Sequence, residues 1–460
     1  MVDKEQPLFN EVKDTEKEGY VPQIREPQPP YTLDELEEVG PDEYAVFTHS
    51  PRLVELWNLA VERVASPWGV LGVALALTSA RLEPTVKIPP IVGSAASLNV
   101  LVALVGRSGA GKGASVGVAT DVIRFMEAGE GFELPEAPLP LGSGQGIAET
   151  FREPRVKQGE APRPRRTRAL FEASEIDTLD ASTKQRGSTL MPVLRQMYSG
   201  ENLGSTNASE DTSRNVPKHS YRASLVCGVQ PKRSGAILNE AEVAGGTPQR
   251  WLWLDCEPYP IDERRSTRPE TAPPIVWVDI AFKPREELLM DVPEEVVKKT
   301  RAMRTNAVTG RISDPLEGHA NLTRIKVACL LAVFGGRRAM TMRDWEVSGL
   351  IMKRSNMVRK RCQDALQEVM VGKIADTARR DALAKEARER EHLEATKRQI
   401  LLKLEAYGRL TMGGAAGLKQ KLSAGRRPTA DDAIEGLVED GLVLSAADER
   451  GQTWFYLPNE

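Results

Sequence analysis

The sequence has few of the residues that build disulfide scaffolds, metal–histidine centres or membrane spans. Its 460 residues include four cysteines and four histidines, all far apart, so neither a disulfide framework nor a zinc-type ligand spacing is visible. The longest apolar stretch, at 68–78, is too short to span a bilayer, and no signal-peptide pattern opens the chain. We therefore expect a soluble cytoplasmic protein with no membrane partner.

The chain also lacks a charge excess, because 62 Lys and Arg face 65 Asp and Glu for a net charge of −3. Any contact with nucleic acid must therefore come from local patches. Residues 1–44 carry thirteen acidic and four basic side chains with several prolines, which predicts a disordered acidic tail and a possible contact for a partner protein. The length leaves room for two to four domains.

The clearest motif follows an apolar run at 100–105, which predicts a buried parallel strand. The run leads into GRSGAGK at 106–112. Glycines let backbone N–H groups close around a phosphate, and the positive end of a following helix favours the same anion. We predict a phosphate-binding loop for ATP, with a chance glycine-rich turn as the alternative; it comprises Gly106, Arg107, Ser108, Gly109, Ala110, Gly111, Lys112, Gly113 and Ala114.

One position departs from this motif. Gly113 stands where the motif has a serine or threonine whose hydroxyl binds Mg²⁺. Ser115 or Ser108 is a candidate substitute, and water is the other possible source of ligands. The missing hydroxyl weakens the prediction of ATP turnover more than the prediction of nucleotide binding.

A second apolar segment ends in carboxylates, reading RALFEASEID at 168–177. In P-loop ATPases a strand end beside the nucleotide supplies one carboxylate that holds Mg²⁺ through water and another that polarises the attacking water. We assign the first role to Glu172 and the second to Glu175. An acidic surface turn is the alternative.

Two later strand ends carry polar residues of interest. The apolar segment 221–229 ends at Gln230, which is placed to sense the γ-phosphate. Arg250 precedes the apolar segment 251–254 and suits an arginine finger in a neighbouring subunit's site, since a guanidinium stabilises the transferring phosphoryl charge. A structural salt bridge is the alternative for Arg250.

Basic side chains in three polar segments are candidates for contacts with DNA phosphates. These segments are 151–168, 183–220 and 232–246, and for the first of them a plain exposed loop is an equal alternative. The predicted DNA-binding residues are Arg163, Arg165, Arg166, Lys184, Arg186, Lys232 and Arg233.

The pattern of segments predicts an α/β fold flanked by helices. Ser-Pro pairs at 50–51 and 66–67 are typical helix starts, and 68–80 is apolar on all sides, which predicts a buried helix. We expect a helical module at 45–95, an ATPase core at 96–316, and a helical cap with a charged connecting helix at 317–395.

The last segment, 396–460, has the pattern of three helices and a hairpin, which indicates a winged helix. Its third helix exposes four acidic side chains, a poor face for a phosphate-lined groove; they are Asp431, Asp432, Glu435 and Glu439. Whether this domain reads DNA or docks a protein stays open.

These stretches in order (LNVLVALVGRSGAGKG, ALFEASEIDTL, LRQMYSGENLG, SLVCGVQP and GGTPQRWLWL) resemble P-loop ATPases of phages, plasmids and integrated elements of actinobacteria. That group is similar to RecA-like hexameric helicases and helicase–primase ATPase modules, and the resemblance covers roughly residues 45–370. It implies a ring of subunits, ATP bound between neighbours and pore loops on DNA. By position it makes Lys112 the Walker lysine, Glu172 and Glu175 the Walker B acids, Gln230 the sensor and Arg250 the finger. The chain departs from the group at Gly113 and at Gln145, where a catalytic glutamate is common.

The leading hypothesis is a DNA-dependent ATPase that acts as a hexameric replicative helicase of a mobile genetic element, using ATP and Mg²⁺ on single-stranded DNA. An origin-binding initiator ATPase is one alternative. A nucleotide-binding DNA scaffold or regulator that does not hydrolyse ATP is the other.

Overall fold

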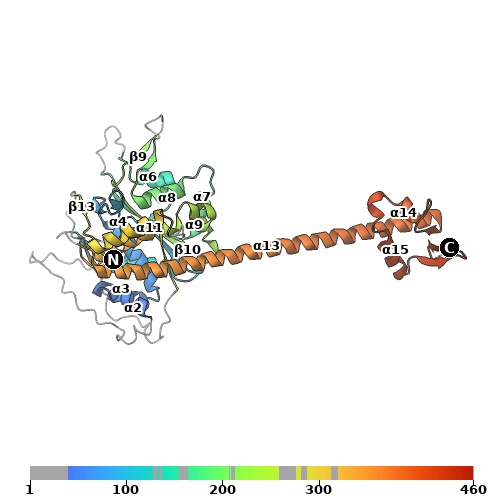
Figure 1. Cartoon of the computed structure of the whole chain (residues 1–460), viewed down its shortest axis with the longest axis horizontal. Coiled ribbons are helices and arrows are strands. Elements are labelled where there is room, and N and C mark those ends of the chain that lie inside the picture. Colours follow the sequence, from blue (N-terminus) through green and yellow to red (C-terminus); the bar gives the residue numbers. More distant parts are fainter. Residues whose placement is uncertain are drawn as a thin grey trace, which may run out of the picture. The chain divides into compact units, whose positions relative to one another are not determined.

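The computed structural model describes residues 40–127, 132–133, 137–154, 164–206, 208, 213–257, 276–280, 287–311 and 320–458 (Figure 1). Nearly all of the predicted acidic tail and the candidate Arg163 lie outside the described residues. The chain divides into two compact units, residues 1–366 and 367–460.

The first unit is built on a five-stranded parallel sheet. Its spatial order is β11 (Trp251–Asp255), β3 (Leu101–Val105), β10 (Arg222–Val229), β7 (Arg168–Ala173) and β6 (Leu139–Pro140). Numbered along the chain, the order is 5-1-4-3-2. β10 therefore separates the strand before the glycine-rich loop from the strand that ends in carboxylates. This α/β architecture is compatible with a Rossmann-type or RecA-like core.

The central strands are buried on both faces, and successive side chains enter different cores. In β3, Val102 and Leu104 belong to one hydrophobic cluster, whereas Leu101, Ala103 and Val105 belong to the other. This alternation follows from the two-residue period of a strand. A parallel strand covered on both faces reads as an unbroken apolar run, which is why the run at 100–105 predicts it.

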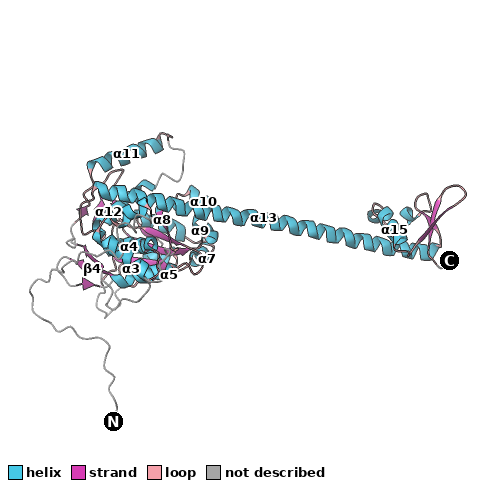
Figure 2. Ribbon diagram, turned by 90° about the horizontal axis from the view of Figure 1, so that it is seen from below, coloured by secondary structure: helices cyan, strands magenta, loops and turns pink. Residues whose placement is uncertain are grey.

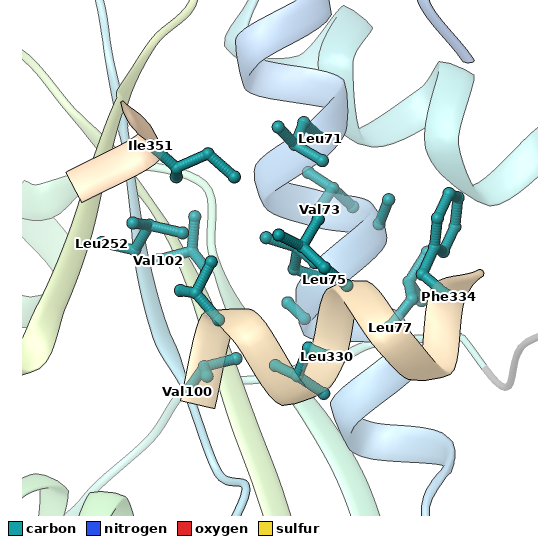
Figure 3. Close-up of a cluster of buried hydrophobic side chains, with 14 of the residues drawn as sticks. Leu71, Val73, Leu75, Leu77, Val100, Val102, Leu252, Leu330, Phe334 and Ile351 are labelled. Atoms are coloured by element: carbon teal, nitrogen blue, oxygen red, sulfur yellow. The ribbon is translucent and has the colours of Figure 1, made fainter. Parts of the chain in front are cut away.

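The first face is covered by α4 (Pro67–Arg81), with α3 (Pro51–Glu62), α5 (Lys112–Val122) and α12 (Ala320–Phe334) around it. Figure 3 shows side chains of α4, β3, β11 and α12 meeting in this core. A Cβ on Gly72 would lie 2.9 Å from both Val102 Cγ1 and Leu254 Cδ1, so only glycine allows α4 to approach so closely. The predicted buried helix is confirmed, and it packs as part of the first unit.

The second face is covered by α6 (Gly144–Thr150), α7 (Ile176–Thr183), α8 (Leu190–Ser199) and α9 (Gly235–Leu238). The smaller elements complete the unit. They are α2 (Pro41–Phe47), α10 (Glu240–Ala244), α11 (Glu294–Val308), the hairpin β8 (Leu203–Ser205) with β9 (Arg214–Val216), and the three-stranded sheet β13 (Leu288–Leu289), β1 (Val86–Ile88) and β2 (Ala96–Ser97).

The segment after α5 does not continue the helix. α5 ends at Val122, and Ile123–Glu127 is the strand β4, which pairs with β12 (Val276–Ile280) and β5 (Phe132–Glu133). Ile123 and Phe125 are both buried, and burial of every second residue is a strand pattern. Pairing with β12, about 150 residues later in the chain, decides the structure here.

Most of the predicted helical cap and charged connecting helix at 317–395 is one helix in the structure. α13 spans Met342–Tyr407, so it begins in the first unit and ends in the second (Figure 2). From Leu366 to Glu391 its side chains are largely exposed, and i,i+4 ion pairs such as Lys385–Glu389 support it. Across the described residues, no helix combines the length and apolarity needed to cross a membrane.

The second unit packs the end of α13 against α14 (Leu418–Lys421), α15 (Ala430–Glu439) and a three-stranded antiparallel sheet. The sheet order is β14 (Leu410–Thr411), β16 (Thr453–Tyr456) and β15 (Leu444–Ala447). The second of the three predicted helices is only the short α14, because the chain before it turns tightly: Gly414 has a φ of +84°, and a Cβ on Gly417 would lie 2.2 Å from the Gly413 carbonyl oxygen. The predicted hairpin is present.

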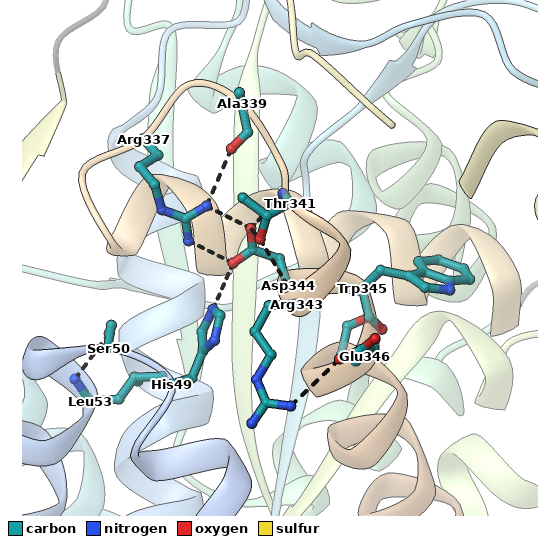
Figure 4. A network of polar contacts seen from close by, with 11 residues as sticks. His49, Ser50, Leu53, Arg337, Ala339, Thr341, Arg343, Asp344, Trp345 and Glu346 are labelled. Carbon is teal, nitrogen blue, oxygen red and sulfur yellow. Dashed lines mark hydrogen bonds and ion pairs between the residues drawn. The ribbon is translucent and has the colours of Figure 1, made fainter. Parts of the chain in front are cut away.

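A buried carboxylate fastens the N-terminal helices to the start of α13 (Figure 4). Asp344 accepts hydrogen bonds from Arg337 Nη1 and Nη2, from His49 Nε2 and from the Thr341 hydroxyl, each at 2.7 Å. Burial alone would raise the pKa of Asp344, but the hydrogen bonds from Arg337, His49 and Thr341 outweigh it and hold the pKa below its ordinary value of 3.8.

We predict that Asp344→Asn destabilises the first unit by about 2 kcal/mol at pH 7, because it removes the charge of a buried carboxylate that accepts hydrogen bonds from the half-buried Arg337 guanidinium. The folded pKa is depressed, so this stabilisation is present above the ordinary pKa near 3.8 and is lost as the pH falls below it. Thermal unfolding from pH 7 to pH 3 should show the difference from wild type shrinking below about pH 4. Glu346→Gln, which breaks only the exposed pair with Arg343, is the matched control and should change little; an equal effect of both substitutions would contradict the assignment.

Candidate nucleotide-binding site

The loop between β3 and α5 has a shape that depends on glycine. Gly109 and Gly111 have φ angles of +79° and +84°, in the left-handed region that other residues avoid. A Cβ on Gly106 would lie 2.8 Å from the Ala110 Cβ. The sequence-predicted loop therefore turns tightly and opens α5 directly at Lys112.

Lys112 bends back over the loop that precedes it. Its Nζ donates hydrogen bonds to the carbonyl oxygens of Gly106 at 3.1 Å and Arg107 at 3.0 Å. The side chain is half-buried, and within the described part of the chain it makes no ion pair with a carboxylate. Its positive charge therefore remains available to an anion held by the loop.

A cavity of about 420 Å³ opens beside this lysine, at the carboxyl ends of β3, β10 and β7. In open α/β sheets this edge, where neighbouring strands lead to different sides, is where ligands bind. The cavity brings the glycine-rich loop and the acidic turn together. Its walls are Leu104, Gly109, Ala110, Gly111, Lys112, Gly113, Val116, Glu172, Ala173, Ser174, Glu175, Val226 and Gly228.

Gly228 makes that meeting possible, although sequence reasoning did not single it out. A Cβ at this position would lie 2.1 Å from the Ser174 carbonyl oxygen and 3.5 Å from Lys112 Cδ. The turn after β7 therefore folds across the end of β10 only because residue 228 has no side chain. This contact carries Glu172 and Glu175 past the intervening strand into the same cavity as Lys112.

The two carboxylates lie in the cavity wall without a cationic partner among the described residues. Glu172 is half-buried and accepts a hydrogen bond of 3.5 Å from the Ser174 hydroxyl, whereas Glu175 is exposed. Ser174 was not predicted, although its place between the two acids was a usable signal. Two carboxylates and a hydroxyl fit Mg²⁺, which prefers oxygen ligands and keeps several waters. Within the described residues no group of three His, Cys, Asp or Glu could form a complete protein cage.

The structure does not support Ser115 as a metal ligand. Its side chain is fully buried, and its hydroxyl donates a hydrogen bond of 3.2 Å to the Gly111 carbonyl oxygen. A Cβ on Gly69 of α4 would lie 2.5 Å from this hydroxyl, so Ser115 faces the helix packed behind the loop. Arg107, Ser108 and Ala114 are exposed outside the cavity wall, and Gly106 contributes through its carbonyl group.

Gln230 and Arg250 lie at opposite ends of the strands of the sheet. Gln230 follows β10 at the carboxyl edge, half-buried and outside the cavity wall. Arg250 precedes β11 at the amino edge, where its Nη1 donates to the carbonyl oxygens of Gly245 at 3.0 Å and Gly246 at 2.6 Å. Burial is the main cause of its lowered pKa. These bonds give Arg250 a structural role in its own chain, and the finger in a neighbouring site stays a prediction.

The predicted DNA-binding residues do not form one surface, and Arg165 has a structural role within its own chain. Its guanidinium donates to the Phe151 carbonyl at 2.8 Å, the Glu153 carboxylate at 3.1 Å and the Ser220 hydroxyl at 2.7 Å, so it clamps the amino edge of the sheet. Arg166 is exposed at the same edge. At the carboxyl edge Lys184 and Arg233 pair with aspartates, whereas Arg186 and Lys232 are exposed with no ion pair to another described residue.

The sequence matches no protein-family model and no curated protein sequence. The functional interpretation of this chain therefore depends on its motifs and on the geometry of the cavity.

We predict that Gly228→Ala weakens binding of a fluorescent ATP analogue by about tenfold or more, because overpacking by one methyl costs about 1–3 kcal/mol and displaces the acidic turn. Gly117→Ala is the matched control, since a Cβ there meets no atom within 4 Å and alanine favours the helix. Equilibrium titration of both variants, after thermal unfolding has shown that each is folded, provides the measurement. Unchanged binding by folded Gly228→Ala would contradict the positioning role of this glycine.

Proposed function

We propose that this chain binds ATP with Mg²⁺ at the cavity beside Lys112 and hydrolyses it, as the ATPase of a hexameric replicative helicase of a mobile genetic element. One observation carries the proposal: a single cavity holds a glycine-rich loop with a lysine and two carboxylates, none of which forms an ion pair with another described residue. Phosphoryl transfer requires positioned cations and carboxylates more than covalent chemistry, and these are the groups present.

Each side chain has a distinct role in this proposal. Backbone N–H groups of the loop at 109–112 bind the phosphates, and Lys112 exchanges its two carbonyl partners for the β- and γ-phosphate oxygens. Glu172 would hold the metal through water, with the Ser174 hydroxyl, 3.5 Å from the Glu172 carboxylate, as a further oxygen beside it. Glu175 orients and polarises the attacking water. When bound, Mg²⁺ neutralises the charge that develops on the phosphate oxygens.

The DNA-dependent part of the proposal depends on the carboxyl edge of the first unit. Arg186 and Lys232 are exposed in loops that follow α7 and β10, on the same side of the sheet as the cavity. Movement of these loops on hydrolysis would therefore move a DNA strand bound to them.

The ring of subunits, and the role of Arg250 as a finger between subunits, are proposed from the resemblance of the motifs. Unwinding of a forked duplex without an origin distinguishes the helicase from an origin-binding initiator with a winged helix at its C-terminus.

A second candidate function is a nucleotide-binding DNA scaffold that does not hydrolyse ATP. Gly113 favours it, because this exposed position on the cavity wall supplies no hydroxyl to the metal.

We predict that Lys112→Ala abolishes ATP hydrolysis with and without single-stranded DNA and leaves the thermal unfolding midpoint close to wild type. The lysine donates only to two carbonyls of its own loop, so the core does not depend on it. Steady-state phosphate release measures the effect. Arg107→Ala, which changes an exposed side chain of the same loop outside the cavity wall, is the matched control. Undiminished hydrolysis in Lys112→Ala would remove the central claim.

Gly113→Thr should lower the Mg²⁺ concentration needed for hydrolysis, because it restores the hydroxyl that the loop lacks. A Cβ at 113 meets no atom within 4 Å, so the new side chain fits. Gly117→Thr, four residues further along α5 and equally unhindered, is the matched control and should leave the Mg²⁺ dependence unchanged. Hydrolysis that appears only in Gly113→Thr would favour the scaffold over the ATPase.

A further inference from the structure

The second unit has an open cleft that the proposed ATPase does not use. It has a volume of about 650 Å³ and lies between the end of α13 and the hairpin of β15 and β16. Tyr407 and Arg409 line it from the helix side, and Trp454 and Tyr456 line it from β16. Both β15 and β16 lie at the C-terminal end of the chain, coloured red in Figure 1.

The aromatic residues that line this cleft are not part of the hydrophobic core of the second unit. Along β16 the side chains alternate, so Phe455 packs on the core formed by residues such as Ile400 and Leu437, whereas Trp454 and Tyr456 lie on the opposite face in the cleft. Tyr407 is 55% exposed. Three large aromatic rings around one open cleft are more than folding requires, and such a patch marks a binding surface.

The Trp454 ring is held in place by a hydrogen bond at its edge. Asp448 Oδ2 accepts from the indole Nε1 at 3.1 Å, while Oδ1 accepts from the backbone N–H groups of Arg450 and Gln452, both at 2.9 Å. Both oxygens of the Asp448 carboxylate therefore already accept hydrogen bonds, one from the turn and the other from the edge of the indole ring. A ring fixed in this way binds a flat partner without losing further side-chain entropy.

Cations accompany the rings. The Arg409 guanidinium carbon lies 5.1 Å from the centre of the Trp454 ring, and Lys421 Nζ lies 3.6 Å from the centre of the Tyr407 ring. The cleft also lacks large aliphatic side chains, because Ala446 and Ala447 are its only aliphatic residues. A peptide would find no pocket for an aliphatic anchor, whereas a nucleobase requires only ring faces and a nearby positive charge.

We propose that this cleft binds single-stranded nucleic acid by stacking bases on Trp454 and Tyr456, with Tyr407 at its edge. Arg409 and Lys421, which lie over the Trp454 and Tyr407 rings in the free protein, exchange these ring contacts for the backbone phosphates of the bound strand. Every base has a flat face, so aromatic platforms flanked by cations hold single strands of varied sequence. α15 exposes Asp431, Asp432, Glu435 and Glu439 to solvent, which disfavours a duplex against that helix. The cleft needs no ATP, so its test is independent of hydrolysis at Lys112.

The test measures binding of the full-length protein to a fluorescein-labelled 20-nucleotide oligothymidine by anisotropy, without ATP. Trp454→Ala should weaken binding roughly 5- to 150-fold, the range found when a ring that stacks on a base is removed. Trp454→Phe should retain most of the affinity, because it keeps a ring. The change should leave the salt dependence of binding unaltered, since no phosphate contact is lost. Leu402→Ala, at a 54% exposed apolar position of α13 outside the cleft, is the matched control.

An abasic strand of the same length separates stacking from phosphate contacts, and wild type and Trp454→Ala should bind it equally. Repeating the comparison with Arg186 and Lys232 both changed to Ala removes two exposed cations that are candidates for DNA contacts in the first unit, and the effect of Trp454→Ala should then be larger. Tyr407→Ala, outside the sheet, provides a second variant if Trp454→Ala unfolds. Oligothymidine binding that is the same in wild type, Trp454→Ala and Tyr407→Ala, or an equal loss for the abasic strand, would overturn the proposal; the first result would direct attention to a protein partner.

Discussion

The structure of the first unit depends on a parallel sheet that is covered by helices on both faces. Because α4 and α8 close the two faces, only the strand ends remain open to a ligand. Parallel pairing gathers the carboxyl ends of β3, β10 and β7 at one edge. The glycine-rich loop and the acidic turn therefore meet although about 60 residues separate them in the chain, and the cavity beside Lys112 is a consequence of the topology.

Within that topology, small distances decide which side chains reach the cavity. Gly228 leaves room for the Ser174 carbonyl to cross the end of β10, which carries Glu175 toward Lys112. Ser115 is only three residues from Lys112 and lies about 60° away around α5, yet it faces Gly69 of α4 behind the loop, whereas the long Lys112 side chain bends back over the loop to the Gly106 and Arg107 carbonyls. The same helix therefore offers one residue to the ligand and another to the core.

Buried charges connect the outer helices to the sheet. The Arg354 guanidinium binds both oxygens of Asp255 at the end of β11, at 3.1 and 2.8 Å, and fixes the first turns of α13. Arg222, fully buried at the start of β10, donates to Ser97 Oγ at 2.7 Å and to the Glu83 carbonyl at 3.0 Å. Lys326 of α12 donates to the Asn99 carbonyl at 2.8 Å. These bonds satisfy buried cations that would otherwise be costly, and they orient the helices around the site.

The sequence by itself determined the features that depend on local chemistry: the strand before the loop, the glycines at positive φ, the position of Lys112, the acids after β7, the buried helix α4 and the C-terminal hairpin. Each is encoded by the period of apolar residues or by a residue type that a turn requires. The tertiary structure alone decided that Ser115 is buried, that Arg165 clamps the sheet, that 123–127 is a strand and that Gly228 belongs to the site. These outcomes depend on partners far away in the chain, and the direction of a side chain is set by what packs against its element, which local periodicity does not encode.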